Sequence, residues 1–334
     1  MPLDVERLAY KPFEYPWAYE AWETQQQIHW LPKEVPLAED VRDWQRNLTP
    51  SEKNLLTQIF RLFTASDIEV GNCYSRYYMQ IFKPTEILMM LTAFSNSETV
   101  HIASYSHLLD TIGMPEVEYA AFLDYKEMQD KHDFMREFRG NDPKSVALTL
   151  AAFGAFTEGL QLFASFAILL NFSRFNKMKG MGQIVTWSAR DETLHAVNII
   201  KLFHTYLGEH PEVDREELAT ELTAMCKQVV ETEDRFIDLS FEQGDVEGIT
   251  KAQVKQYIRY MADIRLTMLG LDGIYGVPNN PLPWMDSILN GIEHAAFFEQ
   301  RSTEYSKAST RGDWGDVFPD QDHIQREVVT DGAV

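Results

Sequence analysis

Apolar residues recur along most of the chain at the three- and four-residue spacing of helices that bury one face. This pattern predicts seven long helices and a shorter last one. They cover residues 52–82, 84–112, 116–138, 144–178, 181–208, 211–243, 251–272 and 283–305. Breaks that contain proline or glycine, such as residues 83–84 and 140–143, separate them. Because no alternating strand pattern and no internal repeat occurs, the sequence predicts an all-α fold.

The two ends of the chain lack this regular pattern. An irregular N-terminal segment is predicted from Pro12, Pro16, Pro32, Pro36 and Pro50, because proline interrupts the interior of a helix. Residues 306–334 are polar and acidic, although they include Trp314 and Phe318. We therefore expect one helical domain over residues 1–305, followed by a flexible C-terminal tail over residues 306–334.

Charge and cysteine content narrow the classes of function. The formal net charge of -21 argues against unaided binding to nucleic-acid phosphates or to an anionic membrane. Two cysteines give neither a disulfide framework nor a cysteine metal motif, so Cys73 and Cys226 are interpreted as core residues. The N-terminus lacks the pattern of a secretion signal, and no uninterrupted apolar run is long enough to span a bilayer. We therefore expect a cytoplasmic protein.

The motif Glu-x-x-His occurs twice, at Glu98–His101 and at Glu192–His195. Two occurrences are close to what chance gives, so the residues around each pair must show whether it binds a metal. Each pair lies on the apolar stripe of a predicted helix, and a carboxylate buried without a partner costs several kcal/mol. Residues three apart are neighbours on a helix, so each pair can bind a cation that offsets this cost.

Two other predicted helices each place one carboxylate among apolar residues. A lone buried carboxylate is more often an ordinary hydrogen-bonded core group, but four of them without a cation would be destabilising. The predicted metal ligands are Asp67, Glu98, His101, Glu158, Glu192 and His195. Four carboxylates and two imidazoles from four helices match the dimetal sites of ferritin-like bundles, with Asp in place of one Glu. This donor set suits iron or manganese better than structural zinc.

Three stretches resemble the radical-generating small (beta) subunit of class I ribonucleotide reductase. They are SETVHIASYSHLLDTIGMP (97–115), ARDETLH (189–195) and FFEQRSTEYS (297–306), and the resemblance extends from about Trp30 to Tyr305. It implies a ferritin-like helical bundle with extra helices around a dinuclear metal site that the six residues above would bind. Two metal ions per chain are expected, with iron favoured and manganese as the alternative.

The resemblance also assigns residues that carry a radical. Tyr105, one helical turn after His101, matches the tyrosine that stores the radical. A phenol this close to a metal ligand can be oxidised by the centre, and apolar neighbours would shield its radical. Trp30, Asp191 and Tyr305 match the relay that passes the radical out of the subunit. Without the resemblance, Tyr105 and Trp30 would be interpreted as packing residues.

The function implied is that of the small subunit of an aerobic ribonucleotide reductase. Oxygen, or an oxidant delivered by a partner, would lead to oxidation of Tyr105, and a separate large subunit would use the radical to reduce ribonucleotides to deoxyribonucleotides. The resemblance implies a homodimer and admits a flavoprotein activator. The nearest alternative is a stand-alone dimetal-carboxylate oxidase or monooxygenase, and a ferritin-like storage protein is another. The storage protein needs no radical tyrosine, and the relay residues argue against the oxidase.

Three positions depart from the family pattern. Phe94 stands where many relatives have tryptophan, so a hydrogen bond to the centre is expected to be missing. Glu69 lies two residues after Asp67 and is a competing candidate ligand. The chain ends in REVVTDGAV, without the aromatic ending of some relatives, which bears on how the tail docks on the large subunit.

Overall fold

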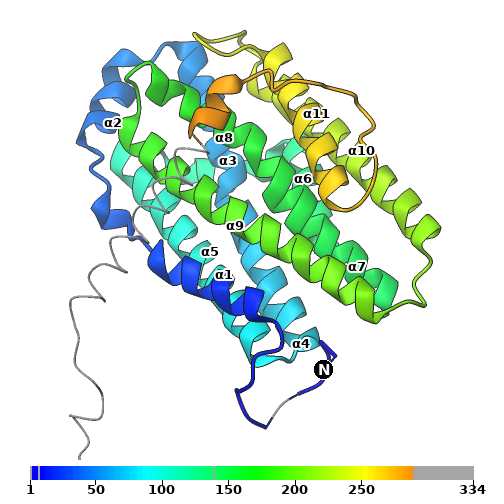
Figure 1. The fold of residues 1–334 in the computed structure, drawn as a ribbon. Coiled ribbons are helices and arrows are strands. Elements are labelled where there is room, and N and C mark those ends of the chain that lie inside the picture. Colours follow the sequence, from blue (N-terminus) through cyan, green and yellow to red (C-terminus); the bar gives the residue numbers. More distant parts are fainter. Residues whose placement is uncertain (1, 7, 138–139, 289–334) are drawn as a thin grey trace, which may run out of the picture. The chain divides into compact units, whose positions relative to one another are not determined.

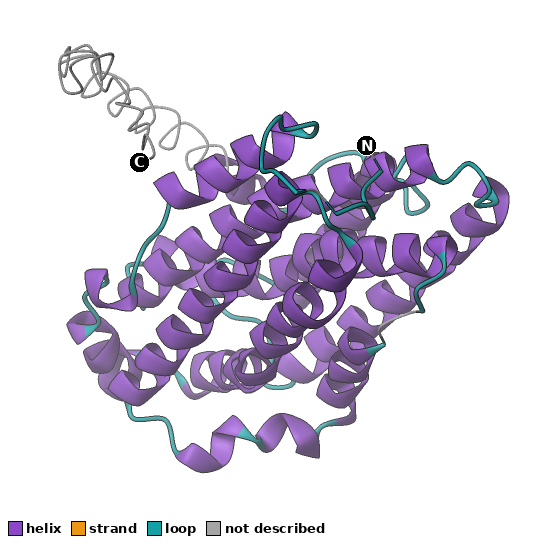
Figure 2. Cartoon of the chain, turned by 90° about the horizontal axis from the view of Figure 1, so that it is seen from below, coloured by secondary structure: helices purple, strands orange, loops and turns teal. Residues whose placement is uncertain are grey.

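The computed structural model describes residues 2–6, 8–137 and 140–288. Within these residues the regular elements are helices, together with one isolated β-bridge between Val246 and Ile249. Figure 1 shows the long helices lying side by side, and Figure 2 shows helices joined by loops in the described part of the chain. The prediction of an all-α fold is confirmed.

The long helices form a bundle in which α9 has a central place. The elements of the bundle are α3 (Pro50–Cys73), α5 (Thr85–Ile112), α7 (Pro143–Leu150), α8 (Leu162–Arg174), α9 (Lys179–Glu209), α10 (Arg215–Ser240) and α11 (Lys251–Met268). Helix α9 packs against α5, α7 and α8, whereas α3 packs along α5 and α10 pairs with α11. Residues 283–288 are helical, so the predicted last helix begins as expected, and its remainder lies outside the described residues.

The N-terminal segment is more helical than predicted. Helix α1 (Pro16–Gln27) packs along α5, and α2 (Ala38–Arg42) continues into a short π-helix, η2 (Asp43–Asn47). Pro16 begins α1 instead of breaking it, because the first turn of a helix does not need the missing N–H. The helix predicted over residues 116–138 is present only in its second half, as α6 (Lys126–Arg136). Two 3₁₀ turns, η4 (Glu116–Tyr119) and η5 (Ala121–Asp124), replace its first half.

Two of the predicted helices contain π-helical segments that the spacing of apolar residues did not reveal. Helix α3 is followed by η3 (Tyr74–Tyr78) and the short α4 (Met79–Ile81). The π-helix η6 (Ala151–Gln161) joins α7 to α8. Such segments are rare and are often found at functional sites. Both of them lie at or near a predicted metal ligand.

Close packing holds η6 against α9 and α11. A Cβ atom on Gly154 would lie 2.4 Å from Cγ2 of Ile199 on α9, so this contact requires glycine. On the other side, Nε of the buried Arg265 on α11 donates a hydrogen bond of 2.7 Å to the carbonyl oxygen of Gly159. These contacts fix the segment that carries Glu158.

The start of α9 is fixed by two buried aspartates from the N-terminal segment. Asp40 accepts hydrogen bonds from the backbone N–H groups of Gly180 (2.9 Å) and Met181 (2.7 Å). Asp43 accepts one from Met178 at 2.9 Å. Carboxylates at a helix N-terminus satisfy its free N–H groups. The position of α9 therefore depends on the segment before α3.

The helical stretch Pro143–Arg174 is long and apolar enough to cross a membrane by length and composition, with a mean hydropathy of 1.5 in its most apolar window. No uninterrupted apolar run of that length occurs in it, because polar residues such as Glu158 and Gln161 interrupt the stretch. That window is entirely buried among the other helices, as in the core helix of a soluble protein.

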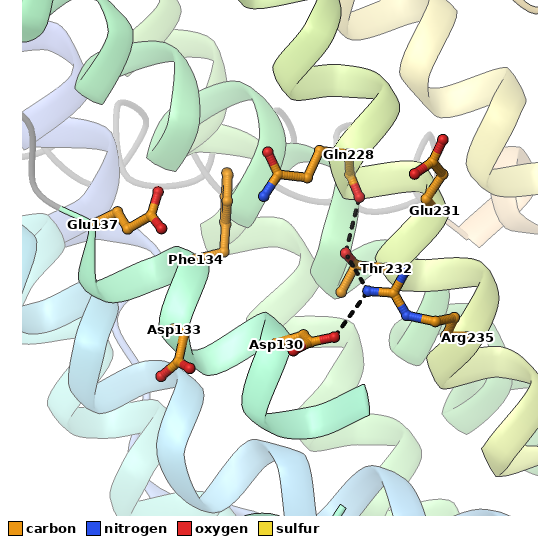
Figure 3. A pocket seen from close by; sticks show the side chains of 8 residues that line it. All are labelled: Asp130, Asp133, Phe134, Glu137, Gln228, Glu231, Thr232 and Arg235. Carbon is orange, nitrogen blue, oxygen red and sulfur yellow. Dashed lines mark hydrogen bonds and ion pairs between the residues drawn. The ribbon is translucent and has the colours of Figure 1, made fainter. Parts of the chain in front are cut away.

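A pocket of about 300 Å³ lies between α6 and α10, and Figure 3 shows that acidic side chains from both helices line it. Arg235 pairs with Asp130 at 3.0 Å there and donates a second hydrogen bond to Thr232. Deeper between the same helices, the buried side chains of Lys131 and Glu233 form an ion pair. These contacts join α6 to α10, and no histidine or cysteine lines the pocket.

The chain divides into one unit, Met1–Ile292, and a second unit, Glu293–Val334. The second unit lies outside the described residues, and with it Tyr305 and the tail over residues 306–334. The predicted boundary at residue 305 therefore stays a prediction.

Candidate metal centre

Six buried side chains from four helical elements meet inside the bundle. Asp67 comes from α3, Glu98 and His101 from α5, Glu158 from η6, and Glu192 and His195 from α9. None of the six is more than 4% exposed. The structure thus brings all six predicted ligands into one interior region.

Two of the carboxylates lie between the two imidazoles. Glu98 has Oε2 3.5 Å from Nδ1 of His101 and Oε1 3.3 Å from Nδ1 of His195. Glu192 repeats this arrangement, with Oε1 3.3 Å from the same nitrogen of His101 and Oε2 3.3 Å from that of His195. Both carboxylates are therefore placed to bridge two cations, each of which would bind one Nδ1.

The other two carboxylates each lie near a different imidazole, Glu158 near His195 and Asp67 near His101. Oε1 of Glu158 is 3.6 Å from Nδ1 of His195. One ligand atom from each of Glu98, Glu158, Glu192 and His195 can be chosen so that all lie within 4.8 Å of one another. Asp67 instead lines a small interior space together with His101 and Glu192. Glu158 and His195 would thus be placed to hold one cation, and Asp67 and His101 to hold the other.

The donor atoms at this centre lack the partners that buried polar atoms normally have. Six of them accept no hydrogen bond in the described structure: Asp67 Oδ2, Glu98 Oε1 and Oε2, Glu158 Oε2, Glu192 Oε2 and His195 Nδ1. Burying carboxylates without compensation is costly, and two divalent cations would compensate all of them. The residues therefore fit a dinuclear centre with oxygen and nitrogen ligands.

Hydrogen bonds on the outer side orient both imidazoles. Nε2 of His101 is 3.2 Å from Oδ2 of Asp191, which also accepts a 2.8 Å hydrogen bond from Nε1 of Trp30. Nε2 of His195 is 3.2 Å from Oε1 of Gln25 on α1. Because both outer partners are acceptors, each Nε2 carries the proton and each Nδ1 is free to bind a metal.

Ser97 links these two outer contacts into one network. Its hydroxyl donates to Oδ2 of Asp191 at 3.2 Å and accepts a longer contact of 3.4 Å from Nε2 of Gln25. Trp30 and Asp191 were predicted from the sequence, whereas Ser97 and Gln25 were not. Ser97 directly precedes the predicted ligand Glu98, but nothing in the sequence around Gln25 indicates this role.

The electrostatics of the ion-free centre favour protonation. Burial would lower the pKa of His101, but the carboxylates around it, first Glu98, hold that pKa well above its ordinary value. The same balance raises the pKa of His195, chiefly through Glu158 and Glu192. Burial raises the pKa of Glu158 to about 7, although the nearby imidazole of His195 opposes this. Metal ions must therefore displace protons when they bind.

Tyr105 lies beside the half of the centre that contains Asp67. It lines the same small space as Asp67, His101 and Glu192, and it is 5% exposed. Its hydroxyl donates to Oγ of Ser188 at 3.3 Å, and burial raises the pKa of this phenol. The ring packs edge-on against Phe63 at 4.8 Å. The phenol is thus protonated, largely enclosed and next to the centre.

A second tyrosine, which the sequence analysis missed, contacts the other half. The hydroxyl of Tyr74 donates a hydrogen bond of 2.7 Å to Oε1 of Glu158. Its ring is 6.1 Å from the imidazole of His195 and is 1% exposed. Tyr74 follows Asp67 by seven residues, which is two helical turns on one face, and this spacing was the signal available in the sequence.

Two sequence expectations about neighbouring residues have clear outcomes. Glu69 does not point toward the other carboxylates: its Oε1 lies 3.4 Å from Nε2 of His132 and 3.9 Å from Nε of Arg136. It is therefore not a competing ligand. Phe94 packs its ring 4.3 Å from the ring of His195 and, as expected, offers no hydrogen bond there.

Comparison with known proteins identifies the family. The family model described as "Ribonucleotide reductase, small chain" matches residues 7–281. This chain belongs to the family of ribonucleotide reductase small chains. It is 42% identical to a probable ribonucleoside-diphosphate reductase small subunit of Invertebrate iridescent virus 3, over 93% of this chain and 88% of the relative. It is 30% identical to the ribonucleoside-diphosphate reductase subunit beta of Chlamydia pneumoniae, over 92% of this chain and 91% of that one.

Solved structures share the fold. The ribonucleotide reductase R2 subunit from Clostridium botulinum superposes with a TM-score of 0.76 at 22% identity, and covers 83% of this chain and 89% of its own. The dimanganese(II)-NrdF of Streptococcus sanguinis gives 0.71 at 21% identity, over 86% and 99%. The ferritin-like helical architecture expected from the sequence is confirmed.

Membership of the family establishes the general function. Small chains of ribonucleotide reductase are the radical-generating subunits of an oxidoreductase, bind a dinuclear iron or manganese centre, and act together with a large subunit. The interpretations as a stand-alone oxidase or a storage protein are not favoured. The roles of individual residues in this chain are a separate question.

Proposed function

We propose that Asp67, Glu98, His101, Glu158, Glu192 and His195 hold the two metal ions of this small subunit. The supporting observation is the set of six inward donor atoms without hydrogen-bond partners, enclosed by two imidazoles whose outer nitrogens are already paired. In this proposal Asp67 and His101 would hold one ion and Glu158 and His195 the other, while Glu98 and Glu192, which lie between the two imidazoles, would serve both. Iron is the favoured metal and manganese the alternative, since both accept this donor set.

Tyr105 is proposed to store the radical. When bound, the two ions supply a one-electron oxidant for this phenol. The hydroxyl then has to release a proton, and the position beside Asp67 provides a nearby carboxylate. Phe63 and the buried helix faces around the ring limit contact of the radical with water and reductants.

The radical is proposed to leave through Trp30. The direct hydrogen bonds from Trp30 to Asp191, and between Asp191 and His101, join this indole to the centre. The rings of Trp30 and His101 are 6.1 Å apart, and the rings of Trp30 and Trp187 are 5.1 Å apart. Tyr305 is proposed to continue the relay toward the large subunit, and it lies outside the described residues.

The remaining proposals concern the binding partners of this chain and its location in the cell. We infer that residues 306–334 form the tail that docks on the large subunit, and that the chain works as a homodimer in the cytoplasm. A flavoprotein activator is proposed as a further partner that would deliver the oxidant. A neighbour of the same fold, Rnr4 of Saccharomyces cerevisiae, was solved as a homodimer.

Metal analysis combined with electron paramagnetic resonance (EPR) tests the assignment. Glu158→Ala and His195→Ala should each lose stoichiometric binding of two ions per chain. Tyr105→Phe should keep both ions, because only the hydroxyl is removed, but should lose the stored radical and nucleotide reduction with the large subunit. If both alanine variants still bind two ions with unchanged affinity, the ligand assignment is wrong. If Tyr105→Phe reduces nucleotides at the wild-type rate, the radical is stored elsewhere.

A further inference from the structure

The centre has two phenols, one at each half. Tyr105 lies beside Asp67 and His101, and its hydroxyl is bonded to Ser188. Tyr74 lies beside Glu158 and His195, and its hydroxyl donates directly to the Glu158 carboxylate at 2.7 Å. In the described part of the chain, Tyr74 is thus the phenol with the more direct connection to a proposed ligand.

The surroundings of Tyr74 suit a residue that undergoes oxidation. The side chain is 1% exposed, and its ring packs edge-on against Tyr78 at 5.6 Å and Phe94 at 6.1 Å. Aromatic neighbours exclude water and leave the hydroxyl with one direction to donate its proton. That direction is Oε1 of Glu158.

The helix geometry fixes this position. Tyr74 is the first residue of the π-helix η3, and Asp67 lies two turns earlier on α3. Glu158 approaches from η6, which is held by Arg265 through the Gly159 carbonyl oxygen. The contact between Tyr74 and Glu158 therefore joins the π-helical segments η3 and η6 at the proposed metal centre.

We propose that Tyr74 is a second oxidisable tyrosine of this centre, which supplies an electron when Tyr105 does not. This inference rests on the proposed metal ligands. In the step, Tyr74 loses one electron to the metal pair and its phenolic proton to Oε1 of Glu158, and no bond between heavy atoms forms or breaks. Dioxygen is the ultimate oxidant. A soluble one-electron reductant later returns the electron, and Glu158 returns the proton, so Tyr74 ends unchanged.

A purely structural role for Tyr74 makes a different prediction. If the hydroxyl only orients Glu158, its removal will alter metal binding or the yield of the Tyr105 radical, but no radical will ever reside on Tyr74. The decisive observation is therefore a radical whose spectrum depends on the ring at position 74, and not a change in activity.

The experiment uses the full-length protein in a Tyr105→Phe background. Variants are loaded with iron(II), mixed with dioxygen, freeze-quenched and examined by EPR, with metal content measured in each. Tyr105→Phe should give a transient organic radical whose hyperfine structure collapses when the tyrosines are ring-deuterated. The signal should be lost in Tyr105→Phe/Tyr74→Phe and retained in the control Tyr105→Phe/Tyr257→Phe. Tyr257 is equally buried but lies on α11.

A conservative replacement guards against damage to the metal site. Insertion of 3,5-difluorotyrosine at position 74 keeps the hydroxyl and should add fluorine splitting to the radical signal. An unchanged spectrum overturns the inference, as does a radical that persists in Tyr105→Phe/Tyr74→Phe. Absence of any radical in Tyr105→Phe, while the wild type binds two ions and forms the Tyr105 radical, overturns it but leaves the proposed function intact. A wild type without radical or metal contradicts both.

Discussion

Gln25 offers a sharp test of how the outer hydrogen bonds control each metal ion. The change Gln25→Leu is close in volume and removes the acceptor that lies 3.2 Å from Nε2 of His195. Both side chains are buried, with 5% and 0% exposure, so water cannot replace the lost acceptor without rearrangement. The Nε2–H of a metal-bound imidazole would then be left unpaired.

The expected loss of metal affinity in Gln25→Leu follows from this geometry. An unpaired buried donor costs about 1–3 kcal/mol. The cost is largest in the metal-bound state, where binding through Nδ1 prevents the ring of His195 from turning toward another acceptor. Outer partners of metal-bound histidines typically change metal affinity by about 10–100-fold, or roughly 1.4–2.7 kcal/mol. We expect a loss in this range for the ion at Glu158 and His195. The ion at His101 keeps its contact with Asp191 and should bind as before.

The assay is an equilibrium titration with manganese(II), in which EPR measures the free ion and chelator competition resolves the two binding steps. Gln26→Leu is the matched control, because Gln26 is the next residue on α1 and its side chain is exposed. Equal weakening of both ions by Gln25→Leu would point to general damage, and unchanged affinity for both would show that the contact has no influence. Either result would refute the reasoning.

Three further predictions concern protons, packing and docking. Because the carboxylates raise the pKa of His101 and His195, and burial raises that of Glu158 to about 7, metal binding displaces protons. Titrations at several pH values should therefore show the affinity for the metal rising with pH. The rise should be about tenfold per pH unit for each displaced proton, as long as the pH lies below the pKa of the group that carries that proton. Gly154→Ala places a methyl group against Ile199 and should lower the free energy of unfolding by about 1–3 kcal/mol in denaturant titrations. Deletion of residues 306–334 should leave metal content unchanged and weaken binding to the large subunit in sedimentation experiments; undiminished binding would rule out tail docking.

The arrangement of each Glu-x-x-His pair could be predicted because it depends on local helix geometry. A spacing of three residues places Glu98 beside His101 whatever the rest of the fold does. The same reasoning, applied strictly, would have excluded Glu69, because a residue two positions after Asp67 lies on nearly the opposite side of the helix. The structure confirms this, since Glu69 pairs with His132 instead.

The parts that escaped prediction depend on contacts between distant segments. Gln25 is 170 residues from His195 in the chain, and no local pattern links them. The π-helices were not predicted because a π-helical turn differs from an α-helical turn only by one extra residue. In a fully buried segment such as η6, the spacing of apolar residues does not reveal that extra residue. Helix α1 was missed because Pro16 was read as a break, although the first turn of a helix accepts proline.

The order of the elements along the chain has a consequence for biosynthesis. The six proposed ligands are complete only when residue 195 has been made, yet Arg265, which supports the Glu158 segment, is synthesised later on α11. A nascent chain would therefore carry all six of these side chains before the last support of the Glu158 segment exists. Metal that arrived at this stage would meet an incompletely supported Glu158 segment, so correct loading should follow the synthesis and packing of α11.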